Sequence, residues 1–277
     1  MAIKIIAGST ADINKKIEER VIIVPLHINF GDEEFLDSIE ITKEDFYNRL
    51  EAGEFPTTSQ PSPGAFLEKY EEIIKSGDEA IVITISSKLS GTYNSASIAA
   101  KGLEDKIKIV DSKTASIGEG ALVELALKLV DEGKSLNEIE NILNEEKENL
   151  VVLALLDTLD YLLKGGRISK TSAVFGKLLS VKVVISTKDG EIVPIGKARG
   201  IKNANNLLVT EIEKNGVNFN KPITIGYTGN DSSKIEKYIS STENIWKGNV
   251  ELDYVKLGSV IGTHAGPGAL GLAFFKN

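Results

Sequence analysis

Gly262-Thr263-His264-Ala265-Gly266-Pro267-Gly268, close to the end of the 277-residue chain, is the stretch around which the rest of the sequence is organised. Apolar runs precede it, at residues 255–261, and follow it, at 270–275, so we predict a loop between two buried strands. Three glycines and a proline free its backbone from regular structure and allow close approach to a ligand. Because binding residues concentrate in such loops, we interpret His264, one of only two histidines, as functional.

Outward from this stretch, apolar runs typical of strands alternate with segments of helical periodicity. The predicted strands are residues 3–7, 21–30, 80–85, 107–110, 150–156, 222–227 and 250–255, and the predicted helices include 42–52, 116–132, 136–149, 203–214 and one that ends near 241. Such alternation predicts an α/β fold with largely parallel sheets. A hairpin over 181–194, with Asp189-Gly190 in its turn, indicates a mixed sheet in the second half.

We therefore predict two α/β domains. Residues 1–150 would form an N-terminal domain with a mainly parallel sheet in three layers. Residues 151–277 would form a C-terminal domain with a mixed sheet and helices. The two consecutive helices predicted over 116–149 place the boundary near residue 150.

Composition excludes several classes of function. The chain is 42% hydrophobic and 26% charged, which is ordinary for a soluble globular protein. Its net charge of -8 and lack of a basic cluster argue against nucleic-acid binding. No cysteine and only two histidines leave little for a metal site. We expect a cytoplasmic protein, since no apolar run reaches the length of a membrane span and no signal peptide precedes the first predicted strand.

Neutral hydroxyls collect where the predicted strands end. Ser9-Thr10, residues 86–90 and Asp111-Ser112 follow three strands, and the loop with Thr57-Thr58-Ser59 leads into a helix. In open α/β sheets ligands bind at the carboxyl ends of the strands, so we expect these groups to lie close together. Hydroxyls and backbone N–H groups can hold one carboxylate or phosphate, whereas a cluster of phosphates would need more cations.

Helix capping explains some of these hydroxyls and not others. We interpret Ser62 and Ser135 as N-caps, the latter in a capping box. At Thr58-Ser59 and Ser90-Gly91-Thr92 the hydroxyls exceed what capping needs, which favours a binding role. Arg167 would by default be a solvated charge at a helix end.

One motif misleads. Residues 266–271 match the G-x-G-x-x-G spacing of dinucleotide sites, but a strand is predicted after them rather than a helix, and the required acidic residue is absent. We therefore reject a nicotinamide or flavin site. Neither a P-loop nor a G-x-S-x-G elbow occurs in the sequence.

Five stretches in order resemble the DegV family of bacterial fatty-acid-binding proteins, and together they cover nearly the whole chain. They are Gly8-Ser9-Thr10-Ala11-Asp12, Thr58-Ser59-Gln60-Pro61, Ser87-Lys88-Leu89-Ser90-Gly91-Thr92-Tyr93, Leu159-Asp160-Tyr161-Leu162-Leu163-Lys164-Gly165-Gly166-Arg167-Ile168 and Gly262-Thr263-His264-Ala265-Gly266-Pro267-Gly268.

The resemblance implies a long-chain fatty acid in a tunnel between two α/β domains. Proteins of this kind serve as the binding subunit of a fatty acid kinase. They need no cofactor and catalyse nothing themselves. They present the carboxylate to a separate ATP-using kinase subunit, which makes acyl-phosphate for phospholipid synthesis.

The resemblance also implies site residues. Thr58, Ser90 and His264 would hold the carboxylate. Residues expected beside the ligand are Ser9, Thr10, Ser59, Gly91, Thr92 and Thr263. No metal site is implied.

Two arginines, Arg167 and Arg199, resemble residues that face the kinase partner. One departure lies nearby, because the family often has a further basic residue where this chain has Ile201. Details of kinase docking therefore do not carry over directly.

The physical chemistry of a fatty acid fits this assignment. About fifteen methylenes at roughly 0.8 kcal/mol each would supply on the order of 12 kcal/mol before ordering costs. The carboxylate needs partners once it leaves water. Two hydroxyls and an imidazole can satisfy it, and a protonated His264 would add a complementary charge. We therefore expect a cradle that needs no Lys or Arg.

Two rival functions are open. A hydrolase could use Ser90 as nucleophile and His264 as base, although no elbow and no orienting acid are evident. A nucleic-acid-binding regulator is the least favoured, given the acidic balance of the chain.

Overall fold

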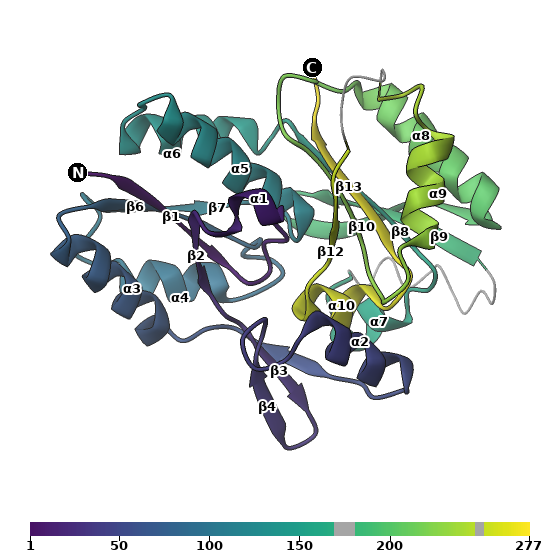
Figure 1. The fold of residues 1–277 in the computed structure, drawn as a ribbon, viewed down its shortest axis with the longest axis horizontal. Helices are drawn as coiled ribbons and strands as arrows, with labels where there is room; N and C mark the ends of the chain where they lie inside the picture. The colour runs from purple at the N-terminus through teal and green to yellow at the C-terminus, as the bar shows by residue number, and fades with distance from the viewer. Residues whose placement is uncertain (169–180, 247–251) are drawn as a thin grey trace.

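The N-terminal half is built on a four-stranded parallel sheet. The computed structural model describes residues 1–168, 181–246 and 252–277 (Figure 1). In the order β2-β1-β6-β7, the sheet contains Val21–Val24, Ile3–Gly8, Glu79–Thr84 and Ile107–Asp111. The middle residues of its central strands, 5–7 and 80–83, are all apolar because both faces are covered.

Helices cover the two faces of this sheet and make the three layers that we predicted. Ile6 and Val82 pack with α3, Pro63–Lys75, and α4, Thr92–Ala99. Their neighbours Ile5 and Ile81 point the other way, toward α5 and α6. Those two helices span Ile117–Asp131 and Leu136–Glu146.

The C-terminal half contains the predicted mixed sheet, which has six strands in the order β10-β9-β8-β13-β11-β12. The strands span Leu150–Leu156 (β8), Val181–Lys188 (β9), Glu191–Arg199 (β10), Ile223–Tyr227 (β11), Tyr254–Lys256 (β12) and Leu270–Phe275 (β13). Among these six strands, as far as the structure describes them, β11 and β12 pair in parallel and every other neighbouring pair is antiparallel. Helices α8, Ile201–Asn215, and α9, Ser233–Ser241, cover one face (Figure 1).

Helix α5 lies between the two large sheets. Its apolar side chains share one core cluster with Ile5 of β1 and with Ala273 and Phe275 of β13. Ile117 packs so closely on Gly271 that a Cβ there would lie 3.0 Å from it. The domain boundary near residue 150 stays a prediction, since this shared core crosses it.

A small third sheet corrects the prediction of one strand over 21–30. Pro25 and Leu26 interrupt that run, so it forms β2 and then β3, His27–Phe30, which belongs to a different sheet. Strand β3 pairs with β4, Glu33–Leu36, and with β5, Thr57–Ser59, inside the segment that looked like an extended loop. Helix α2, Lys43–Glu51, packs beside it, and a one-turn helix α1, Lys15–Glu18, follows β1.

The stretch before His264 is also corrected. Residues 259–265 form a short helix, α10, Ser259–Ala265, where we predicted strand and loop. His264 therefore lies in the last turn of a helix that ends at Gly266, whose φ is 72°. The helix packs against α2, where Gly262 lets the Phe46 and Tyr47 rings approach its backbone. A second short helix, α7, Asp160–Gly165, lies next to α10 (Figure 1).

Candidate functional site

A cavity of about 350 Å³ lies between the two large sheets, and both halves of the chain line it. The lining residues are Leu26, Thr58, Ser59, Gln60, Ile85, Leu89, Ser90, Gly91, Ala115, Ser116, Ile117, Val152, Ala154, Leu156, Leu162, Arg167, Ile185, Ser186, Thr187, Ile192, Leu257, Val260, Ile261, His264, Ala265, Ala269, Leu270 and Gly271.

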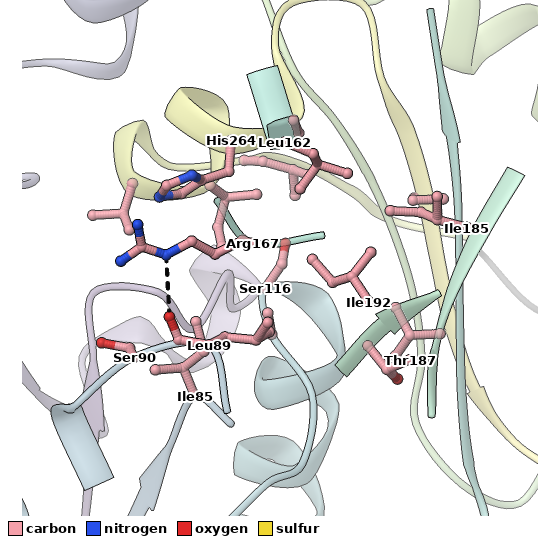
Figure 2. Close-up of a pocket in the computed structure, with 18 of the residues that line it drawn as sticks. Ile85, Leu89, Ser90, Ser116, Leu162, Arg167, Ile185, Thr187, Ile192 and His264 are labelled. Carbon is pink, nitrogen blue, oxygen red and sulfur yellow. Dashed lines mark hydrogen bonds between the residues drawn. The ribbon is translucent and has the colours of Figure 1, made fainter. Parts of the chain in front are cut away.

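The polar residues that we expect at the carboxylate gather in one part of this cavity, although Thr187 lies near Ile192 and Leu89 lies near Ser90 (Figure 2). Figure 2 shows His264, Arg167 and Ser90 gathered on one side of the view, with Ile185 and Ile192 on the other. The polar side is built from the ends of α7 and α10 and from the loop after β6. Such a cavity suits an amphipathic ligand with one polar end.

Thr58 and His264 meet at the polar end. The Thr58 hydroxyl in β5 lies 3.1 Å from His264 Nε2 in α10, although 206 residues separate the two. The other ring nitrogen, Nδ1, is buried without a hydrogen-bond partner. It lies against Gly165, where any Cβ would overlap the ring. An N–H at Nδ1 would have no acceptor, so the neutral ring carries its proton on Nε2 and donates to Thr58.

The charge of His264 in the ligand-free protein follows from its surroundings. Burial, followed by the nearby Arg167 cation, lowers the pKa of His264 to about 4. A group with that pKa is neutral at pH 7, so the complementary charge that a protonated His264 would add is absent from the ligand-free ring.

Ser90 lies at the end of the loop between β6 and α4, on the other side of Arg167 from His264 (Figure 2). Its hydroxyl lies 2.9 Å from Thr92 Oγ1 and accepts a hydrogen bond from the Thr92 N–H. Next to it, Gly91 gives space to the Gln60 side chain, which a Cβ at position 91 would overlap. Gln60 also donates to Ser95 Oγ at 3.0 Å, so it ties the end of β5 to α4. Our sequence interpretation gave Gln60 no role.

Arg167 lies inside the site rather than as a solvated charge at a helix end. It is half-buried, lines the cavity and donates through Nε to the carbonyl oxygen of Leu89 (Figure 2). A terminal nitrogen of the same guanidinium donates to the carbonyl oxygen of Gly165. The polar end therefore contains a cation, contrary to the cation-free cradle that we expected. The signal in the sequence was the Gly165-Gly166 pair, which brings the α7 backbone against the histidine. Arg199 is exposed at the end of β10, outside the cavity lining.

The residues expected beside the ligand divide into two groups. Ser59 and Gly91 line the cavity, whereas Ser9, Thr10, Thr92 and Thr263 are buried outside its lining. These four hydroxyls have internal partners, which are the Leu26 N–H, Glu119 Oε2, Ser90 Oγ and the Ser259 carbonyl, respectively.

Within residues 1–168, 181–246 and 252–277, no group of three or more His, Asp or Glu side chains is arranged to hold a metal ion. In the same residues, none of the helices combines the length and the apolar character that crossing a bilayer requires.

Comparisons with known proteins agree with this architecture. The model of a family described as "Uncharacterised protein, DegV family" matches residues 2–277. A DegV domain-containing protein of Caldanaerobacter subterraneus subsp. tengcongensis is 35% identical over 98% of both chains. The chain belongs to the DegV family.

Solved DegV-like structures have the same fold. A DegV family protein from Thermus thermophilus, described by its fatty acid binding, is 31% identical, with a TM-score of 0.88 over the whole of both chains. A stearic-acid-binding protein from Eubacterium ventriosum is 28% identical, with a TM-score of 0.89 over 100% of this chain and 98% of its own. The parallel N-terminal sheet and mixed C-terminal sheet are thus those of DegV structures.

Proposed function

We propose that this DegV protein binds one long-chain fatty acid, with the acyl tail in the cavity and the carboxylate beside Thr58, Ser90 and His264. The observation that carries the proposal is the cavity itself, which is apolar along most of its wall and polar at one end. The similarity to proteins from Thermus thermophilus and Eubacterium ventriosum that are described as binding fatty acids supports it.

The polar end offers donors for a carboxylate. With the His264 proton directed at Thr58, the Thr58 hydroxyl is free to donate its own hydrogen to a carboxylate oxygen. Ser90 can donate in the same way once it turns from Thr92. Arg167 uses Nε and one terminal nitrogen on backbone carbonyls, which leaves further N–H groups for the anion.

The tail supplies the affinity. Each methylene removed from water contributes roughly 0.8 kcal/mol, so aliphatic side chains are sufficient to line the tail. Residues such as Val152, Leu156 and Ile192 provide that wall. They come from β8 and β10 of the mixed sheet, on the face that α8 does not cover.

We further propose that the protein presents this carboxylate to a separate ATP-dependent fatty acid kinase and catalyses nothing itself. Arg199 is exposed and Arg167 lies at the carboxylate end, which suits contact with a phosphate-carrying partner. A hydrolase is less consistent with the geometry. His264 Nε2 lies beside Thr58, and no acid orients Nδ1.

Lipid extraction tests the binding step. Purified protein, denatured and extracted into organic solvent, should release an acyl chain that mass spectrometry identifies, and delipidated protein should bind added palmitate. Thr58→Val should weaken palmitate binding, while Thr57→Val, one residue earlier and outside the cavity lining, should not. No lipid in the extract together with no palmitate binding would disprove the proposal.

The kinase step needs a separate measurement. The loaded protein, mixed with a fatty acid kinase subunit and ATP, should yield acyl-phosphate, trapped as a hydroxamate. The Arg199→Ala variant should bind palmitate normally and yield less product. Normal binding without any product, across several kinase subunits, would confine the function to lipid binding.

A further inference from the structure

Helix α10 is too short to fix the position of His264 by itself. It has seven residues, its N-cap residue is a glycine without a side chain, and helices of this length are marginal without outside support. At its N-terminal end the Asp12 carboxylate accepts a hydrogen bond from the Gly258 N–H. Its last residue is followed by Gly266 and then by a turn that leads into β13. His264 is the second-last residue of the helix, so the position of the imidazole depends on this turn as well as on the packing of α10 against α2.

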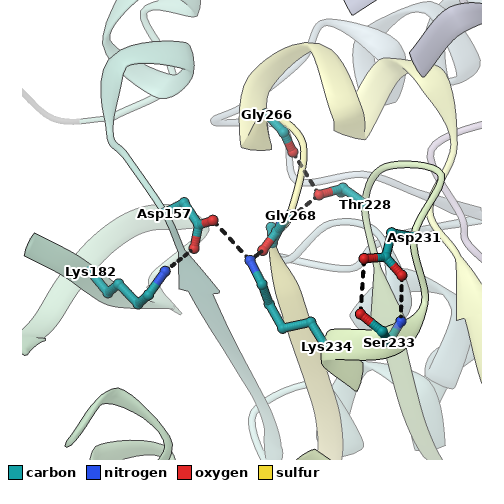
Figure 3. Close-up of polar contacts among 9 residues, drawn as sticks. Asp157, Lys182, Thr228, Asp231, Ser233, Lys234, Gly266 and Gly268 are labelled. Atoms are coloured by element: carbon teal, nitrogen blue, oxygen red, sulfur yellow. Dashed lines mark hydrogen bonds and ion pairs between the residues drawn. The ribbon is translucent and has the colours of Figure 1, made fainter. Parts of the chain in front are cut away.

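Thr228, the residue after β11, holds it. Its side chain is 1% exposed, and its hydroxyl donates to the Gly266 carbonyl at 2.6 Å and accepts from the Ala269 N–H at 2.7 Å (Figure 3). The backbone of Thr228 adds bonds to Gly268 and Ala269. One residue thus satisfies both sides of the turn, and a single hydroxyl joins the end of α10 to the start of β13.

Lys234 supports the turn from α9. Its ammonium donates to the Gly268 carbonyl at 2.7 Å and pairs with Asp157 at 2.8 Å (Figure 3). Asp157 in turn pairs with Lys182 of β9. These contacts lie outside the cavity lining, so they act on the ligand only through the turn.

We propose that Thr228 is a positioning residue of the binding site, whose hydroxyl fixes residues 266–269 and so holds the His264 ring within reach of Thr58. The inference rests on the proposed function, because the ring matters here as part of the carboxylate end. Without the hydroxyl, the buried Gly266 carbonyl and Ala269 N–H lose their partner, and the turn must move to find another.

Two substitutions separate the hydroxyl from the space that it fills. Thr228→Val keeps the shape of the side chain and removes both hydrogen bonds, whereas Thr228→Ser keeps the hydroxyl and removes a methyl group. Ser233→Ala, at the first residue of α9, is the matched control, since the hydrogen bonds of Ser233 run to Asp231 and not to the turn (Figure 3).

The test reads His264 directly. In ¹⁵N-histidine-labelled, ligand-free protein, Thr228→Val should shift the His264 ring signals. The same variant should lower the affinity for palmitate about tenfold, the size expected if the carboxylate end loses one buried hydrogen bond. Thr228→Ser should restore both to near the wild-type values, and Ser233→Ala should change neither.

Two results would overturn the inference. One is a Thr228→Val protein with wild-type ring signals. The other is a Thr228→Ser protein as impaired as Thr228→Val, which would assign the effect to packing. If wild-type protein binds no palmitate, the proposed function fails, yet the ring signals still decide whether Thr228 positions His264.

Discussion

The Asp12 carboxylate accepts a hydrogen bond of 2.6 Å from the backbone N–H of Gly258, 246 residues further along the chain. The same carboxylate accepts from Ser116 Oγ at 2.7 Å and lies 3.8 Å from Lys43 Nζ. One buried side chain therefore joins the loop after β1, the start of α5 and the start of α10. Because α10 carries His264, this junction connects the N-terminal sheet to the cavity.

Asp12 makes stability depend on pH. Burial is the largest cause that raises its pKa from 3.8 to about 6, against the opposing effects of Lys43 and Ser116. Since the folded pKa exceeds the unfolded one, the contribution of Asp12 to stability is present below pH 3.8 and is lost as the pH rises through 6. A shift of this size corresponds to about 3 kcal/mol. Relative to Asp12→Asn, the wild-type free energy of unfolding should fall by up to that amount between pH 4 and 7.

Urea denaturation at a series of pH values measures this difference. Ser116→Ala removes a donor to the carboxylate, so it should extend the loss of stability to higher pH. If the free energies of unfolding of wild type and Asp12→Asn differ by a constant amount from pH 4 to 7, the pKa of Asp12 is not raised by folding.

Much of the fold could be predicted from the sequence, because its signals are local. Residues 80–85 are apolar except for Thr84, which is typical of a strand covered on both faces, and Asp189-Gly190 is typical of a tight hairpin turn. What the turn contacts could not be predicted. The Gly190 carbonyl accepts a hydrogen bond from Ser86 Oγ at 2.7 Å, a contact that exists only once the two halves pack.

The helix α10 and the polar end show the same limit. Val260 and Ile261 favour a strand locally, but Gly262 makes room for the Phe46 and Tyr47 rings, and that packing overrides the local preference. The resemblance named Thr58, Ser90 and His264 without their geometry. The roles of Gln60 and Arg167 depend on contacts with Gly91 and Leu89, which no spacing in the sequence reveals.

The ligand should change the protonation of His264. The folded pKa of about 4 lies below the ordinary value of 6.5, so the contribution of the neutral ring to stability is present above pH 6.5 and is lost as the pH falls through 4. A carboxylate bound beside the ring favours its charged form, so palmitate should raise this pKa. Arg167→Gln should raise it in the ligand-free protein, since that cation is the second cause of the depression.

An NMR titration of the ring protons measures these pKa values. The chain has only two histidines, so His27→Gln leaves a single signal to follow. A ligand-free His264 that titrates near 6.5 would contradict the burial argument. A His264 pKa that palmitate does not change would instead show that the carboxylate binds away from the ring.

Gln60 fits against Gly91 and bonds to Ser95 of α4, and we call these two contacts the Gln60 joint. This joint should be necessary for palmitate binding. Gly91→Ala would force the Gln60 side chain away and separate β5, which carries Thr58, from the Ser90 loop. The displaced Gln60 side chain would lose its hydrogen bond to Ser95 Oγ, which contributes roughly 1 kcal/mol, so palmitate affinity should fall about fivefold. Gln60→Ala breaks the same joint, so it should cause a similar loss, and the double variant should lose no more than either single variant. Gly64→Ala is the control, because its Cβ would meet only Ser62 Oγ at 3.6 Å. Additive losses in the double variant would argue against the joint.

The residues that line the tail part of the cavity should determine which acyl-chain length the protein prefers. Ala154 of β8 lines the cavity next to Gly271, its pairing partner on the neighbouring strand β13. Ala154→Trp would therefore fill space that the proposed tail occupies. In wild type, affinity should rise about fourfold for each added methylene until the cavity is full, which follows from roughly 0.8 kcal/mol per methylene. In Ala154→Trp that rise should stop several carbons earlier, while the shortest acids bind as before, because the carboxylate end is unchanged.

Ile195→Trp, on β10 but outside the lining, should keep the wild-type profile. Competition binding with saturated acids of increasing length measures these profiles. An equal loss at every length would mean that the tail does not pass Ala154, since only the carboxylate end is common to all of the acids.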